Sequence, residues 1–142
     1  MNRVYNNEGI IMACIVHILR KRDMDMALLY LLSTLLVDNQ LSIILRVSVD
    51  FEQLSVSIRN QGLISRKLYA LGPYFMNALV ILKQSNIIKI YDGRLRLTDY
   101  SFPEGSLQSR RLGRIIKNSG HLINLCDKLS TKEIYNKLNI QL

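Results

Sequence analysis

The stretch from Asn86 to Asp99, NIIKIYDGRLRLTD, predicts a two-stranded β-hairpin and decides the fold. Two short runs rich in strand-forming residues flank Asp92-Gly93, and Asp-Gly is among the strongest hairpin turn signals. A two-residue turn at this dipeptide fixes the register of the strands. The predicted pairs are Tyr91 with Arg94, Ile90 with Leu95, Lys89 with Arg96, and Ile88 with Leu97.

The predicted hairpin has one apolar face and one cationic face, because successive side chains of a strand point to opposite sides. The apolar face holds Ile88, Ile90, Leu95 and Leu97. The cationic face holds Lys89, Tyr91, Arg94 and Arg96. That four apolar side chains fall together is an independent check on the register.

Helices are predicted before the hairpin. Their expected bounds are Glu8 to about Arg20 after a cap at Asn7, Asp25 to Val37, Phe51 to about Asn60 after a cap at Asp50, Leu63 to Leu71, and Pro73 to about Ser85. Gly72-Pro73 is expected to separate the last two helices. Residues 40–49 fit either a short helix or a strand.

Two more helices are predicted after the hairpin. A loop over Phe102 to Ser106 leads to a helix from about Leu107 to Ser119, which Gly120 should end. The last helix begins at Ser130, where STKE has the spacing of a capping box. The pattern predicts a mainly α (α+β) fold, a helical winged-helix-like domain with one β-hairpin wing.

Length and composition favour one ordered domain over residues 1–142 with an anionic partner. The chain carries 19 Lys and Arg against 11 Asp and Glu, for a net charge of +8. Its longest apolar run, residues 27–37, is shorter than the roughly 20 residues of a membrane span. With no signal peptide and no Cys-x-x-Cys spacing, we expect a soluble cytoplasmic protein with free thiols at Cys14 and Cys126.

The helix before the hairpin is predicted to contact protein rather than bases. In a DNA-reading helix-turn-helix domain, this helix presents hydrogen-bonding side chains to the major groove. Here apolar side chains cover nearly its whole circumference, which favours core or subunit contacts. The candidate partner-binding residues are Tyr74, Phe75 and Met76 on this helix, with Leu29 and Tyr30 on the apolar helix at residues 25–37.

Two cationic surfaces are candidates for contact with nucleic-acid phosphates. The first is the hairpin face of Lys89, Tyr91, Arg94 and Arg96, where Lys89 opposite Arg96 is mildly unfavourable unless an anion lies between them. The second is a helical face with Arg110, Arg111, Arg114 and Lys117. Both surfaces also fit a solvated face that maintains solubility, or an acidic protein partner.

No catalytic or metal-binding pattern stands out in the sequence. G-x-S-x-G, the phosphate-binding G-x-x-x-x-G-K-[ST] loop and H-E-x-x-H are all missing. Cys14 and His17 are three residues apart on a helix, but a metal site needs three or four ligands, so core packing is the better interpretation. The sequence predicts a protein that is not an enzyme and binds no cofactor, metal or small-molecule substrate.

The chain resembles the middle component of three-component ABC-ATPase systems, a family that includes the small third subunit of Lamassu-type anti-phage defence. The similarity runs through several segments: NNEGIIMACIVHIL, MDMALLYLLSTLLVDNQLSIILR, LYALGPYFMNALVILKQSNIIKIYDGRLRL, SRRLGRIIKNSG and KEIYNKLNIQL. The family usually shows Asn-Pro-Ala near its start, where this sequence has Asn7-Glu8-Gly9.

The resemblance implies a non-catalytic accessory subunit of an SMC-like ATPase defence complex, which bridges the ATPase and an effector, often a nuclease. DNA would be touched only through non-specific phosphate contacts, with no membrane involved. The alternative is a stand-alone winged-helix transcriptional regulator. A regulator should dimerise and prefer one operator about a thousandfold or more over bulk DNA.

Overall fold

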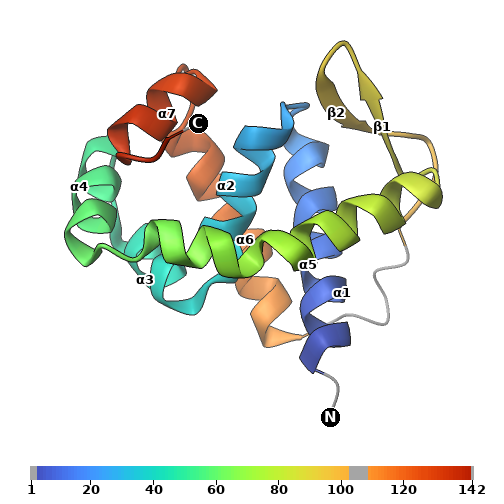
Figure 1. Cartoon of the computed structure of the whole chain (residues 1–142), viewed down its shortest axis with the longest axis horizontal. Coiled ribbons are helices and arrows are strands. Elements are labelled where there is room, and N and C mark those ends of the chain that lie inside the picture. The colour runs from blue at the N-terminus through green and yellow to red at the C-terminus, as the bar shows by residue number, and fades with distance from the viewer. Residues whose placement is uncertain (1–2, 103–108, 142) are drawn as a thin grey trace.

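Seven helices and one β-hairpin make up the structure, a computed structural model that describes residues 3–102 and 109–141 (Figure 1). The helices are α1 (Arg3–Lys21), α2 (Met26–Val37), α3 (Asn39–Val47), α4 (Phe51–Gln61), α5 (Ile64–Gln84), α6 (Arg110–Leu125) and α7 (Thr131–Lys137). The strands are β1 (Ile88–Tyr91) and β2 (Arg94–Leu97). The predicted fold class, a mainly helical domain with one β-hairpin wing, is confirmed.

The hairpin, called the wing below, has the predicted turn and register. All four predicted residue pairs form an antiparallel ladder. Asp92 and Gly93 have φ of 53° and 75°, as a two-residue turn with both central residues left-handed requires. The wing is also attached to the helices, because Met24 exchanges two main-chain hydrogen bonds with Leu95, at 3.3 and 2.8 Å.

The side-chain caps that the sequence predicts at Asp25, Asp50 and Ser130 are present. The Asp25 carboxylate accepts a hydrogen bond from Leu28 N at 2.9 Å, and Asp50 caps α4 in the same way. The predicted capping box is present at Ser130 and Glu133. Gly62 ends α4 with φ of 75°, a conformation that costs glycine little.

The predicted break at Gly72-Pro73 is wrong, since α5 runs unbroken from Ile64 to Gln84. Proline removes one helical hydrogen bond and crowds the preceding turn. Tertiary contacts from α2 compensate: the Tyr30 hydroxyl donates to the Leu68 carbonyl oxygen, one turn before Pro73. Gly72 leaves room for this contact, because a Cβ there would lie 3.2 Å from the Tyr30 hydroxyl oxygen.

Other predicted boundaries also change. The first helix starts at Arg3, so Asn7 lies inside it and is not its cap. Residues 39–47 form a helix, which settles the open assignment of residues 40–49 in favour of a helix. The helix after the wing continues through Gly120 to Leu125, because the buried Leu122 outweighs the modest cost of a glycine. Residues 103–108, which hold most of the predicted loop and the predicted start at Leu107, lie outside the described residues.

Helix α2 is the centre of the core. It contacts α1, α3, α5 and α6, and nine of its twelve residues are buried, as its near-continuous leucine content predicts. The buried apolar side chains form one hydrophobic cluster within the described residues. No single helix in this part of the chain combines the length and the apolar character needed to cross a membrane; α2 and α3 together do, but are bent by 92°.

We predict that two neighbouring substitutions on α5 lower the free energy of unfolding by very different amounts. Phe75→Ala should lower the free energy of unfolding by about 3–5 kcal/mol, because Phe75 is 1% exposed and its loss leaves a cavity. Met76→Ala, at a side chain 47% exposed, should cost less than about 1 kcal/mol. Urea unfolding followed by circular dichroism measures both, and similar costs would contradict this placement of α5.

Candidate functional site

The wing presents part of its cationic face to solvent. Lys89, Tyr91 and Arg94 are exposed, and Arg96 is half-buried. Arg94 nevertheless donates a 2.9 Å hydrogen bond from Nη2 to the Asp23 carbonyl oxygen. The Arg96 guanidinium carbon lies 5.6 Å from the centre of the Tyr91 ring, a cation–π contact across the two strands. These contacts hold the two arginines against the wing and the turn before α2.

The sequence suggested that an anion lies between Lys89 and Arg96. In the structure the Asp23 carboxylate supplies negative charge next to Arg96. Its Oδ2 lies 3.6 Å from Arg96 Nε, and both side chains are 43% exposed. A pair this exposed contributes at most about 1 kcal/mol. Lys89 forms no ion pair with any described residue. The wing therefore offers Lys89 and Tyr91 directly, whereas a phosphate must compete with Asp23 for Arg96.

The four basic residues of α6 do not form one equivalent surface. Arg110, Arg114 and Lys117 are exposed. Arg111 is half-buried, and its Nη2 donates to the Val37 carbonyl oxygen at 3.3 Å, near the C-terminal end of α2. A cation at the negative end of a helix stabilises that helix. Arg111 thus has a structural role that the sequence pattern did not reveal.

The wing and the first turn of α6 lie apart in the structure. Figure 1 shows the wing at the upper right, whereas α6 begins near the lower edge of the molecule, close to the first half of α1 in this view. The two groups of cationic residues predicted to contact nucleic acid are therefore treated as two separate surfaces.

The exposed side of α5 carries both apolar and polar side chains. Phe75, Ala78, Leu79 and Leu82 point into the core, as the helical spacing of a buried face requires. On the outside, Met76, Val80 and Ile81 are 47%, 48% and 40% exposed. We call these three residues the α5 apolar face. Three exposed polar side chains, Asn77, Lys83 and Gln84, lie on the same side of the helix.

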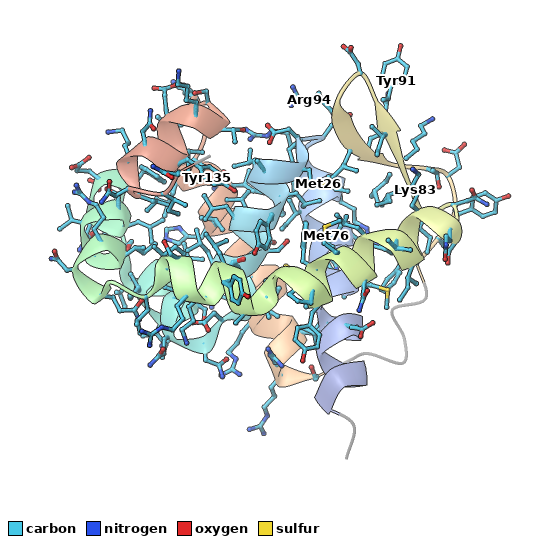
Figure 2. All side chains as sticks on the ribbon, in the orientation of Figure 1. Met26, Met76, Lys83, Tyr91, Arg94 and Tyr135 are labelled. Carbon is cyan, nitrogen blue, oxygen red and sulfur yellow. The ribbon has the colours of Figure 1, made fainter. Side chains whose placement is uncertain are left out.

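An apolar groove of about 580 Å³ runs between α2, α5 and the C-terminal segment. Figure 2 shows three of the residues that line it, Met26, Met76 and Tyr135, around the crossing of these elements. The lining residues are Met26, Ala27, Tyr30, Gly72, Pro73, Phe75, Met76, Tyr135 and Gln141. None of them carries a formal charge at neutral pH.

The predicted partner-binding residues fall into different environments. Tyr30 and Met76 line the groove and remain accessible. Phe75 lines it too, but at 1% exposed it belongs to the core, and its ring centre lies 5.0 Å from that of Tyr30. Leu29 is fully buried and offers no surface to a partner. Tyr74 lines a separate cleft with Lys67 and Arg111.

The C-terminal helix completes the groove, which sequence reasoning missed. The Tyr135 hydroxyl donates to the Ala27 carbonyl oxygen at 2.5 Å, and Thr131 Oγ1 donates to the Asp25 carboxylate at 2.5 Å. Burial raises the pKa of Tyr135 to about 12, with smaller contributions from Tyr30 and Asp25. These contacts join residues more than a hundred positions apart, so no local pattern indicates them.

The thiols and His17 do not form a metal site. Cys14 and Cys126 are buried. His17 Nδ1 lies 3.4 Å from Arg20 Nη1, a contact within α1. Among the described residues there is no group of three or more His, Cys, Asp or Glu side chains that could hold a metal ion.

Comparison with known proteins gives no relative. No protein-family model matches the chain, and neither a curated protein nor a solved structure matches it.

We predict that the native thiols resist alkylation. Burial raises the pKa of both Cys14 and Cys126 to about 12 from an ordinary value of 9.0, which lowers the reactive thiolate fraction about a thousandfold. Iodoacetamide at pH 8 should therefore label the native chain far more slowly than the chain in urea, as measured by intact mass.

The same pKa shift also gives a pH dependence of stability. The unfolded chain releases protons above pH 9 that the native thiols retain, so the free energy of unfolding should fall as the pH rises from about 9 toward 12. Urea unfolding at several pH values measures this fall. In the alkylation experiment above, rapid labelling of the native chain at both thiols would contradict their burial.

Proposed function

We propose that the protein is a non-catalytic accessory subunit of an SMC-like ATPase complex of anti-phage defence. In this proposal it bridges the ATPase and an effector subunit in the cytoplasm, and it touches DNA only through phosphates. The family resemblance in the sequence suggests the kind of complex. The structural observation that carries the proposal is the exposure of the α5 apolar face, Met76, Val80 and Ile81.

The exposed side of α5 favours contact with protein over contact with bases. Base edges in the major groove are read by side chains that donate or accept hydrogen bonds, chiefly Arg, Lys, Asn and Gln. Met76, Val80 and Ile81 do neither, and their exposure costs free energy unless a partner covers them. The α5 apolar face therefore supports an assembly role, whereas a sequence-specific regulator would have to use the exposed Asn77, Lys83 and Gln84 beside it.

The uncharged lining of the groove indicates which kind of partner segment can bind there. A segment that docks there meets Met26, Met76, Pro73 and the two tyrosines, so it must itself be apolar. Methionine side chains adapt to different apolar shapes, which suits a protein surface contact. Met76 belongs both to the groove and to the α5 apolar face. One partner helix or extended segment can therefore cover these two surfaces.

The wing fits a weak and non-specific role in DNA binding. Its exposed groups are a lysine, a tyrosine and an arginine, side chains that can contact phosphate oxygens and sugars. Asp23 reduces the charge available at Arg96. In the proposed complex, DNA held by the ATPase would pass along the wing while α5 is covered by protein.

Charges placed on the α5 apolar face should release the partner without unfolding the chain. Met76→Glu with Val80→Glu should reduce co-purification of the proposed SMC-like ATPase partner at least about tenfold, because both side chains would be buried at the interface. Arg66→Glu, an exposed site on the same helix, is the matched control. Full retention of the ATPase by a folded double variant would contradict this interface.

Two substitutions, one on the wing and one at the Asp23 carboxylate that pairs with it, should change DNA affinity in opposite directions. Lys89→Gln should weaken binding to a random-sequence duplex and reduce the slope of log K against log salt by about 0.9, as expected for one lost phosphate contact. Asp23→Asn should strengthen binding, because it leaves Arg96 to the phosphate while keeping the main-chain acceptor of Arg94.

Fluorescence anisotropy over a salt series measures both effects. If both variants bind as the wild type does, the wing has no phosphate contact. A strong preference for one duplex sequence would instead favour the regulator.

A further inference from the structure

Tyr91 is an exposed aromatic side chain at the outer end of the wing. It is the last residue of β1, and it is 65% exposed. Figure 2 shows it beyond the body of the helices, beside the turn of the wing. An aromatic side chain stabilises a fold mainly through the area that it buries, and Tyr91 buries little. Its ring is therefore available for a contact outside the chain.

The Tyr91 ring is held in place before any ligand binds. Tyr91 pairs with Arg94 in the ladder of the wing, and the Arg96 guanidinium carbon lies 5.6 Å from the ring centre. Arg96 is itself anchored, because its Nε lies 3.6 Å from Asp23 Oδ2. A side chain that is already positioned loses less conformational freedom on binding. The wing thus presents a flat ring with a cation against it.

Further positive charge lies within reach of the ring. Lys89 precedes Tyr91 by two residues on β1, so the two side chains share a face about 7 Å apart along the strand. Lys89 is exposed and forms no ion pair with any described residue. Arg94, opposite Tyr91, is also exposed. The nearby carboxylates are Asp92 in the turn and Asp23, which is already engaged in an ion pair.

A flat ring beside basic side chains matches an unpaired nucleotide better than a duplex. In a duplex, each base face is covered by the neighbouring base pair, which leaves the wing only the phosphate contacts of the proposed function. In a single strand, a base can stack on an aromatic ring while the phosphates contact lysine and arginine side chains. An acidic protein segment would use the basic side chains and leave the ring without a stacking partner.

We propose that the wing binds an unpaired nucleotide of single-stranded DNA, with the base stacked on Tyr91 and a phosphate at Lys89. This inference rests on the wing being the DNA-binding surface of the proposed function, and it adds a contact that duplex DNA cannot make. Every base has a flat face, so the contact does not depend on sequence. The subunit would therefore favour places where the two strands are separated.

A fluorescent side chain at this position tests the stacking directly. The chain contains no tryptophan, so Tyr91→Trp introduces a single reporter. Tyr69→Trp is the matched control, because Tyr69 is 86% exposed on α5. A short thymidine oligonucleotide should quench the emission of Tyr91→Trp saturably, whereas a duplex of the same length should not, and Tyr69→Trp should respond to neither. Equal quenching of both variants, or equal quenching by strand and duplex, overturns the proposal.

Affinity measurements separate stacking from charge. Tyr91→Leu should weaken binding of the single strand about tenfold and leave duplex binding unchanged, as expected for the loss of one stacked base. Tyr91→Phe keeps the ring and should bind as the wild type does. Fluorescence anisotropy measures both, with circular dichroism to confirm that the variants are folded. A Tyr91→Leu variant that keeps its affinity for the single strand, or loses affinity for strand and duplex equally, overturns the stacking contact.

Failure of this inference and failure of the proposed function give different results. If single-strand binding does not need Tyr91 while Lys89→Gln still weakens duplex binding, the stacking contact is wrong and the phosphate contact of the wing stands. The assembly role is tested separately, by the substitutions on the α5 apolar face. Those substitutions lie on another element and leave the Tyr91 ring unchanged.

Discussion

The packing of Phe75 against Tyr30 is the contact on which the arrangement of the molecule depends. The two ring centres are 5.0 Å apart with planes inclined by 35°, and the Tyr30 hydroxyl bonds to the Leu68 carbonyl oxygen of the same long helix. These contacts fasten α5 across the central helix α2 at the point where Pro73 would otherwise weaken it. Because α5 leads directly into β1, its position also fixes where the wing stands (Figure 1).

Fixing α5 in this way divides its circumference between two roles. One side is taken by the core, and the opposite side exposes Met76, Val80 and Ile81 beside a groove without charged residues. Further cationic side chains lie on the wing and around the start of α6, while Lys83 lies on α5 itself. The candidate phosphate contacts on the wing and on α6 are therefore on other elements than the α5 apolar face. This arrangement is the basis of the proposed assembly role, in which duplex DNA would be touched only through phosphates.

The sequence predicted those features that depend on local chemistry. The Asp92-Gly93 turn fixed the register of the wing, and Asp25, Asp50 and Ser130 marked helix starts through caps that act within three residues. The errors have a tertiary cause. Helix α5 crosses Gly72-Pro73 because Tyr30 from α2 supports it, and Leu29 and Phe75 are core residues because neighbouring helices cover them. Asp23 near Arg96 and Tyr135 in the groove depend on contacts between distant parts of the chain, for which periodicity gives no signal.

The central claim is that the exposed side of α5 faces protein while DNA is left to the wing. A photo-crosslinking amino acid at position 76 or at position 89, in cells that also express the proposed SMC-like ATPase partner, tests this claim most directly. The account predicts a protein adduct from position 76 and a DNA adduct from position 89. A DNA adduct from position 76 would place α5 in a groove of the duplex and contradict the account.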